Sequence, residues 1–111
     1  MPPHTAKGGE FLSPTGNISC EIDYQNGGLD QVYCQTIAPP RSVTMSATGV
    51  INKKCSGEGC IGNPAEDARV LPYGASTSAG PFRCTSRATG MTCTVGHNGF
   101  TISRSGITLR A

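Results

Sequence analysis

Residues 82–109 read FRCTSRATGMTCTVGHNGFTISRSGITL, and this stretch decides the fold. In a strand, alternate side chains point to the same face of the sheet. With connections at residues 87–90, 96–99 and 104–105, four strands arise in which opposed residues form two rows of apolar residues and cysteines. The rows are Phe82, Val95, Phe100, Leu109 and Cys84, Cys93, Ile102, Ile107. The stretch therefore predicts an antiparallel meander with one dry face.

The other face of this meander is rich in hydroxyl and guanidinium groups. Such a flat polar array suits a polysaccharide, another cell-envelope polymer or a protein strand. The alternative is that β-branched threonine is simply favourable at exposed strand positions. Nucleic-acid binding would use Arg83, Arg87, Arg104 and Arg110, on or around this face. Nucleic acid is a poorer match, because no aromatic residue lies among these arginines for base stacking. We take the following residues as the candidate binding face: Arg83, Thr85, Thr92, Thr94, Thr101, Ser103 and Arg104.

The composition is that of one small domain with a thin core. The chain has 111 residues with three Phe, three Tyr and no Trp, and its 15 Gly and 8 Pro favour turns. Charged residues make up 14%, and a formal net charge of +2 gives no field that attracts nucleic acid or an anionic membrane by itself. No apolar run approaches the roughly 18 residues of a membrane span. We expect a monomer with no nucleic-acid partner and no membrane span.

Six cysteines in so short a chain indicate an oxidising compartment. A hairpin centred on Gly27 opposes one cysteine pair, the first hairpin of the meander opposes a second, and the remaining pair closes a short glycine-rich loop. The sequence therefore predicts three local disulfide bonds: Cys20–Cys34, Cys55–Cys60 and Cys84–Cys93. From the cysteines we expect a secreted or extracytoplasmic protein. Because no signal-peptide core follows Met1, we expect that its export signal has been removed.

The chain before the meander supplies shorter elements. Residues 1–9 contain almost nothing to bury and predict a disordered arm, which leaves residues 10–111 as a single β domain. Residues 11–13 predict a short strand and residues 14–17 a turn. In residues 18–24 the polarity alternates, which places one set of side chains on a common face: Ile18, Cys20, Ile22 and Tyr24.

The middle of the chain is less regular. Residues 42–45 and 49–51 predict a further strand pair. Asn63 is suited to cap a helix, with proline and glutamate following at favourable positions, so a short helix is expected at residues 64–69. Residues 75–80 are expected to form a loop that leads into the meander. The fold class is thus all-β, a mainly antiparallel sheet or a small sandwich or barrel built from hairpins and stapled by disulfides, with at most one short helix.

Several short motifs together resemble a known family. They are Phe11-x-Ser13-Pro14-x-Gly16-Asn17-Ile18-x-Cys20, Leu71-x-Tyr73-Gly74, Phe82-x-Cys84-x-Ser86, Gly90-x-Thr92-Cys93 and Gly99-Phe100-x-Ile102-Ser103-Arg104. As a set, they resemble a small cysteine-containing domain of unassigned function in secreted proteins and lipoproteins of actinobacteria, mycobacteria included. The resemblance covers residues 10–110 and implies an exported β domain with four cysteines. It supplies no catalytic residues, and Cys55 and Cys60 lie outside its pattern.

Catalytic and metal chemistry find little support in the sequence. There is no C-x-x-C motif, and the two histidines, His4 and His97, fall in the predicted arm and in a turn, so we expect no metal and no cofactor. Paired cysteines leave no thiolate nucleophile. The remaining catalytic candidate is an acid–base set of His97 with Glu21, Glu58 or Arg104.

The sequence favours a secreted, non-enzymatic binding or envelope-associated module whose partner is an unknown protein or cell-envelope polymer. One alternative is a protease-inhibitor-like protein that presents the loop between Cys55 and Cys60, because a disulfide lowers the cost of ordering a loop on binding. The other alternative is a small secreted hydrolase.

Overall fold

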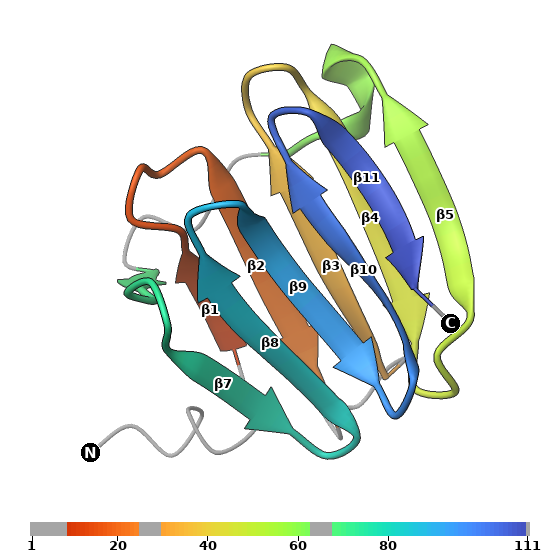
Figure 1. Ribbon diagram of the computed structural model, residues 1–111. Coiled ribbons are helices and arrows are strands. Elements are labelled where there is room, and N and C mark those ends of the chain that lie inside the picture. The colour runs from red at the N-terminus through yellow and green to blue at the C-terminus, as the bar shows by residue number, and fades with distance from the viewer. Residues whose placement is uncertain (1–8, 25–29, 63–67, 111) are drawn as a thin grey trace.

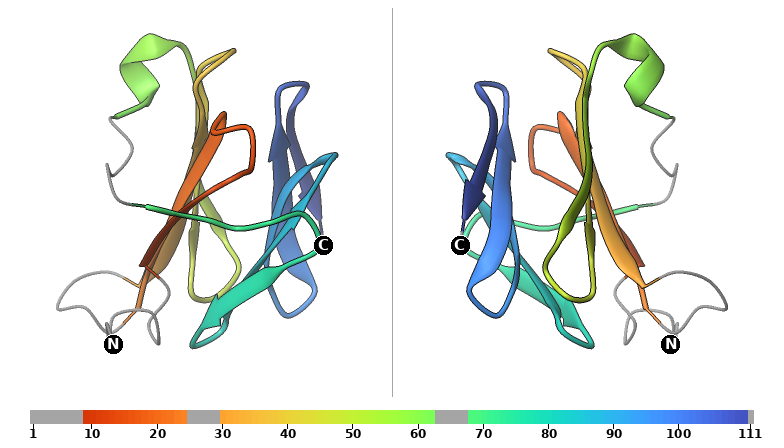
Figure 2. Two further views of the ribbon diagram at one scale, coloured as in Figure 1. Left: turned by 90° about the vertical axis from the view of Figure 1, so that its left-hand side faces the viewer. Right: turned by 90° about the vertical axis from the view of Figure 1, so that its right-hand side faces the viewer.

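The computed structural model describes residues 9–24, 30–62 and 68–110. These residues form two β-sheets that pack face to face as a sandwich, seen from the front in Figure 1 and edge-on in Figure 2. The all-β fold class expected from the sequence is confirmed. In the described part of the chain, no helix has the length and apolar character that crossing a bilayer requires.

The first sheet contains six strands in the order β5-β4-β3-β2-β1-β6. Their bounds are β1 Gly9–Leu12, β2 Ile18–Asp23, β3 Gln31–Thr36, β4 Arg41–Ser46, β5 Ile51–Ser56 and β6 Arg69–Val70. Neighbouring strands are antiparallel except for β1 and β6, which are parallel.

The second sheet contains five antiparallel strands in the order β11-β10-β9-β8-β7. Their bounds are β7 Ser76–Ala79, β8 Phe82–Arg87, β9 Gly90–Val95, β10 Asn98–Ser103 and β11 Gly106–Arg110. The predicted meander is therefore this sheet without β7.

The core lies between the sheets and consists of the inward side chains of both. Phe11 of β1, Phe82 of β8 and Phe100 of β10 are at most 1% exposed. Burying a side chain of this size stabilises the fold by about 1.5–3 kcal/mol. The first sheet thus covers the dry face of the second, and the thin core is shared between them.

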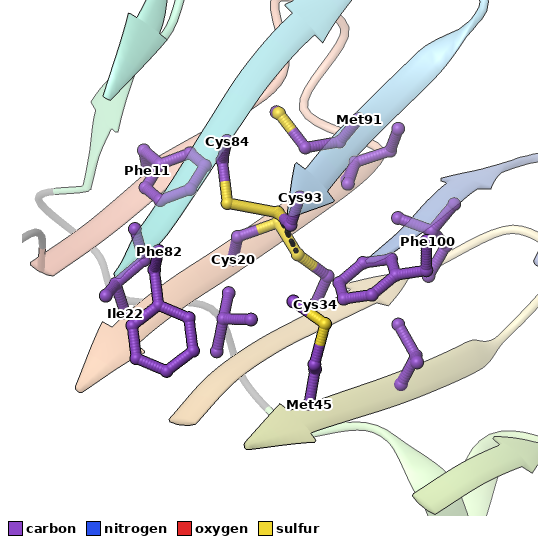
Figure 3. Packing of buried hydrophobic residues seen from close by; sticks show 14 of the residues in the cluster. Phe11, Cys20, Ile22, Cys34, Met45, Phe82, Cys84, Met91, Cys93 and Phe100 are labelled. Atoms are coloured by element: carbon purple, nitrogen blue, oxygen red, sulfur yellow. Dashed lines mark hydrogen bonds between the residues drawn. A yellow bond between two sulfur atoms is a disulfide. The ribbon is translucent and has the colours of Figure 1, made fainter. Parts of the chain in front are cut away.

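All three predicted disulfide bonds are present: Cys20–Cys34, Cys55–Cys60 and Cys84–Cys93. The first and the last link neighbouring strands, and their Cα atoms lie 4.0 Å apart. These two bonds meet in the centre of the sandwich, where the Sγ atoms of Cys34 and Cys93 are 3.7 Å apart (Figure 3). Each sheet therefore presents its own disulfide to the other sheet.

Two of the three hairpin registers predicted for the meander are confirmed. Cys84 lies opposite Cys93, and Phe100 lies opposite Leu109. Leu109 is nevertheless 50% exposed, because β11 is the edge strand of its sheet and only part of the side chain is covered.

The register between β9 and β10 differs from the prediction. Phe100 was expected opposite Val95 and instead lies opposite Cys93, while Ile102 lies opposite Met91. The connection is a two-residue turn rather than the expected four, and the positive φ of its first residue suits such a turn. A shift of two residues keeps every side chain on its predicted face.

Other boundaries also differ. Gly9 was assigned to a disordered arm but begins β1 and lies opposite Ile22; residues 1–8 lie outside the described residues. The strand expected at residues 49–51 begins only at Ile51 and continues to Ser56, because Gly49, with a φ of 86°, belongs to the preceding turn.

Two elements after β5 were predicted differently. The loop expected at residues 75–80 contains β7, whose backbone pairs with β8 although its residues show no apolar alternation. The helix expected at residues 64–69 falls largely on residues 63–67, which lie outside the described residues, as does the turn around Gly27. Arg69, placed at the end of that helix, begins β6 because it pairs with β1.

Candidate functional site

Four turns meet at one end of the sandwich and enclose a pocket of about 440 Å³, a volume suited to a small ligand. Two turns belong to the first sheet, at residues 13–17 and 37–40, and two to the second sheet, at residues 88–89 and 104–105. Figure 1 shows them together at the upper end of the sheets. Tyr73 completes the wall from the segment that crosses between the sheets in Figure 2. We call this hollow the turn-end pocket.

Asn17 joins the two turns of the first sheet. Its Oδ1 accepts a hydrogen bond from the Ala38 N–H at 2.9 Å, and its Nδ2 donates to the Ala38 carbonyl at 3.2 Å. Its own carbonyl accepts from the Ile37 N–H at 3.0 Å. Gly16, with a φ of 80°, lets the chain turn just before this residue. The wall formed by the first sheet is therefore held in one geometry.

Gly90 brings the turns of the second sheet close together. A Cβ atom at this position would lie 2.6 Å from the Ile102 carbonyl oxygen and 3.0 Å from the Ser103 Cβ, so only glycine permits this approach. The neighbouring turn is tied to the first sheet, because the Arg41 Nη1 donates a hydrogen bond to the Arg104 carbonyl at 2.9 Å. The side chain of Arg104 is exposed and lines the pocket.

Tyr73 lies in a turn that is fastened to β8. The Ala75 N–H donates to the Pro72 carbonyl at 2.9 Å, and the Gly74 N–H donates to the Ser86 carbonyl at 2.7 Å. The Tyr73 side chain is 50% exposed, which leaves much of it available to a ligand. An exposed aromatic ring with a polar tip on a fixed backbone is a common recognition group.

The charge of the pocket is positive. Arg87 and Arg104 both line it, and among the described residues no Asp or Glu does. Thr15, Asn17 and Ser103 add uncharged polar groups. Guanidinium groups bind carboxylate and phosphate through paired hydrogen bonds. The pocket can therefore hold an anionic group, with neutral hydrogen-bonding groups and one aromatic ring beside it.

The predicted binding face lies on the outside of the second sheet. The registers align five hydroxyl residues in one row across the strands: Ser76, Thr85, Thr92, Thr101 and Thr108. Their hydroxyls bond to each other, at 2.8 Å between Ser76 and Thr85 and at 2.8 Å between Thr92 and Thr101. Of the seven residues predicted for this face, only Ser103 and Arg104 line the turn-end pocket.

Sequence reasoning did not assemble the turn-end pocket. It considered Arg87 only as one of four arginines for nucleic-acid binding. It placed Asn17 in a turn and Tyr73 in a motif of the family resemblance without connecting the two. Four of these five motifs contribute lining residues to the pocket. The available signal was that these motifs place their polar residues in turns at the same end of successive hairpins.

The acid–base set considered from the sequence is not brought together. His97 lies in the β9–β10 turn and Arg104 in the β10–β11 turn, at opposite ends of β10. Glu21 lies on the outer face of the first sheet, and Glu58 lies in a 3₁₀ turn after β5, Glu58–Cys60.

Acidic residues gather on the outer face of the first sheet instead. Glu21 lies opposite Glu10. A hydrogen bond with Asp23, partial burial and the negative charges of Asp23 and Glu10 raise the pKa of Glu21 from its ordinary 4.5 to about 7. The protein thus keeps its carboxyl cluster on a different face from the arginines of the turn-end pocket.

The loop between Cys55 and Cys60 is exposed in its middle and anchored at its base. The Gly57 N–H donates to the Pro40 carbonyl at 2.9 Å. Beyond the loop, the buried Gln35 amide exchanges two hydrogen bonds with the Gly62 backbone, at 2.8 and 2.9 Å. The protease-inhibitor role of this loop stays a prediction.

The described residues contain one group of three potential metal ligands, the Sγ atoms of Cys20, Cys34 and Cys93. Each is in a disulfide bond, so none is a thiolate that can coordinate a metal. No protein-family model matches the chain, and neither a curated protein nor a solved structure matches it.

Proposed function

We propose that this protein is a secreted, non-enzymatic binding module that recognises an anionic group of a cell-envelope polymer or protein through the turn-end pocket. The observation that carries the proposal is the pairing of two exposed guanidinium groups, Arg87 and Arg104, in a hollow without an acidic lining residue among those described. An anionic ligand would supply the countercharge.

The rigidity of the pocket supports binding without a large ordering cost. Asn17 connects two of the turns, Arg41 connects a third to the opposite sheet, and the Tyr73 turn is fastened to β8. A site that is ordered before the ligand arrives loses less entropy on binding.

Export is supported by the three disulfide bonds, which persist in oxidising compartments. The family resemblance described above also implies an exported domain. Binding, rather than turnover, is supported by a pocket whose chemistry is that of positioned cations and hydroxyls.

An NMR titration of the ¹⁵N-labelled protein with galacturonate, and with glucose as the neutral counterpart, tests the proposal. Galacturonate at tens of millimolar is expected to shift the backbone amides of Tyr73, Gly90 and Arg104, whereas glucose leaves them in place. Arg104→Gln is expected to lose most of this response and Arg83→Gln, on the outer face of the same sheet, to retain it. The proposal fails if galacturonate produces no shifts, or if the shifts map to the residues around Arg83 instead.

A further inference from the structure

A second hollow lies next to the turn-end pocket. It measures about 250 Å³ and is lined by Arg41, Lys54, Cys55, Ser56 and Ile107. These residues come from β4, β5 and β11, so the hollow sits at the margin where the edge strands of both sheets approach each other.

A single hydrogen bond connects the two hollows. Arg41, which lines the second hollow, donates from its Nη1 to the carbonyl of Arg104, which lines the turn-end pocket, at 2.9 Å. Arg104 belongs to the turn that leads into β11, and Ile107 of β11 lines the second hollow. The two hollows therefore flank the same contact between the sheets.

The charged side chains that line the two hollows are all positive. Four of the nine lysines and arginines of the chain line the two hollows: Arg87, Arg104, Arg41 and Lys54. Among the described residues no carboxylate lines either hollow. The nearest acidic residue along the chain is the exposed Glu58, beyond the rim formed by Cys55 and Ser56. With a formal net charge of only +2, this gathering of cations is local.

We propose that the ligand is an acidic polysaccharide that extends from the turn-end pocket across Arg41 into the second hollow, so that successive anionic groups meet successive cations. This inference rests on the proposed function of the turn-end pocket. A single anionic group would use only the first hollow and would leave the Lys54 ammonium in the second hollow without an anionic partner.

The groups between the cations fit a sugar chain. Thr15, Ser103 and Ser56 supply hydroxyls for sugar hydroxyls, and Tyr73 supplies a ring on which the apolar face of a pyranose stacks. Nucleic-acid strands, by contrast, are held by several aromatic platforms, and among the described residues Tyr73 is the one aromatic that lines either hollow. Two linked subsites raise affinity by making the second contact intramolecular.

The length of the ligand oligomer is the variable that tests this proposal. The intact protein is titrated by calorimetry with galacturonate and with its dimer, tetramer and hexamer, with glycerol-phosphate oligomers of matched length as a phosphate-bearing alternative, and with malto-oligosaccharides as neutral controls. We expect affinity to rise at least tenfold from monomer to tetramer and then to level off for the galacturonate series, and not for the neutral series. A rise confined to the glycerol-phosphate series, which contains no sugar ring, would identify a phosphate polymer as the ligand and overturn the polysaccharide proposal.

Lys54→Gln is the variant that isolates the second hollow, because the Lys54 side chain is exposed and lies outside the turn-end pocket. It is expected to leave galacturonate monomer binding unchanged and to weaken tetramer binding about fivefold, whereas Arg83→Gln changes neither. The proposal is overturned if affinity does not depend on length, if Lys54→Gln leaves tetramer binding intact, or if a single-stranded oligonucleotide binds more tightly than every acidic glycan. Monomer binding without length dependence would overturn the two-hollow site and leave the proposed function standing.

Discussion

The outer face of the second sheet and the turn-end pocket are both polar, yet their polar groups are arranged in opposite ways. On the face, Thr92 and Thr101 bond to each other, and Ser76 bonds to Thr85. In the pocket, hydrogen bonds hold the backbone of the turns. The guanidinium groups of Arg87 and Arg104 line it, and no acidic residue among those described does. The face uses its hydroxyl groups to join strands, and the pocket offers its guanidinium groups to a ligand.

This difference separates a polar surface from a binding site. Cross-strand threonine pairs contribute to sheet stability and need no further partner. Cations gathered in a hollow of fixed shape raise each other's electrostatic energy until an anion binds. The comparison can be tested by substitutions that affect stability in one region and binding in the other.

The largest effect is expected at Gly90, where the two regions meet. Gly90 and Gly106 have almost the same φ, 140° and 138°, but a Cβ would be 2.6 Å from a backbone oxygen at Gly90 and would meet nothing within 4 Å at Gly106. Gly106→Ala is expected to lower the free energy of unfolding by about 2 kcal/mol through backbone strain alone. Gly90→Ala adds a clash and is expected to lose about 2 kcal/mol more. Urea unfolding measures both, and equal losses would contradict the close approach at Gly90.

Removing both guanidinium groups of the pocket is expected to have the next largest effect. Arg87→Gln/Arg104→Gln should weaken binding of acidic oligosaccharides about 100-fold, since each charge-assisted hydrogen bond contributes about 1.5–3 kcal/mol. The free energy of unfolding should change by less than about 0.5 kcal/mol, because both side chains are exposed. Calorimetric titration and urea unfolding of the same sample provide both numbers. A matched pair on the face, Arg83→Gln/Arg110→Gln, should leave binding intact; if it instead abolishes binding, the face is the site.

The two regions were not equally predictable from the sequence. The buried apolar face and the exposed polar face of the meander follow from the alternation of side chains along its strands. The same alternation placed Cys20 opposite Cys34 and Cys84 opposite Cys93. Alternation does not distinguish registers that differ by two residues, because both place the same side chains on the same face. The predicted register between β9 and β10 was therefore wrong by two residues. Strand β7 escaped prediction because its pairing with β8 is made by backbone groups and its side chains show no apolar pattern.

The turn-end pocket was hidden for a different reason. Its lining comes from two turns of each sheet and from Tyr73, and the two sets of turns meet only when one sheet packs on the other. Hairpin periodicity contains no information on how two sheets are rotated against each other. Arg104 was singled out on the polar face, and Arg87 belongs to the same sheet, but Asn17 of the first sheet is brought to them only by packing of the two sheets.

The titration of Glu21 on the first sheet is expected to change the stability of the protein without changing its affinity for the ligand. Because the pKa of Glu21 is about 7 in the folded protein and near 4.5 when unfolded, the folded state holds the extra proton between these values. The free energy of unfolding is therefore expected to fall as the pH rises from 4.5 to 7, by about 1 kcal/mol once solvent screening is included. Glu21→Gln should abolish this decrease and be the more stable protein at pH 8.

Urea unfolding of the wild type and of Glu21→Gln across this pH range measures the effect, with the exposed Glu58→Gln as a control that keeps the wild-type profile. Affinity for acidic oligosaccharides should stay constant over the same range, because arginine remains charged and a carboxylate with a pKa of about 3.5 remains ionised. A stability profile that is the same with and without Glu21 would show that the carboxyl group does not hold the proton.

The smallest effect on the free energy of unfolding is expected for the hydroxyl pair on the outer face of the second sheet. The Thr92 and Thr101 hydroxyls lie 2.8 Å apart and bond to each other, so Thr92→Val/Thr101→Val removes both partners together and leaves neither unpaired. The free energy of unfolding should then change by less than about 0.5 kcal/mol, whereas Thr92→Val alone should cost up to about 1 kcal/mol. Ligand affinity should be unchanged in both variants. If the double variant binds acidic oligosaccharides more than fivefold less tightly, these hydroxyls contact the ligand, and recognition extends from the turn-end pocket onto the face.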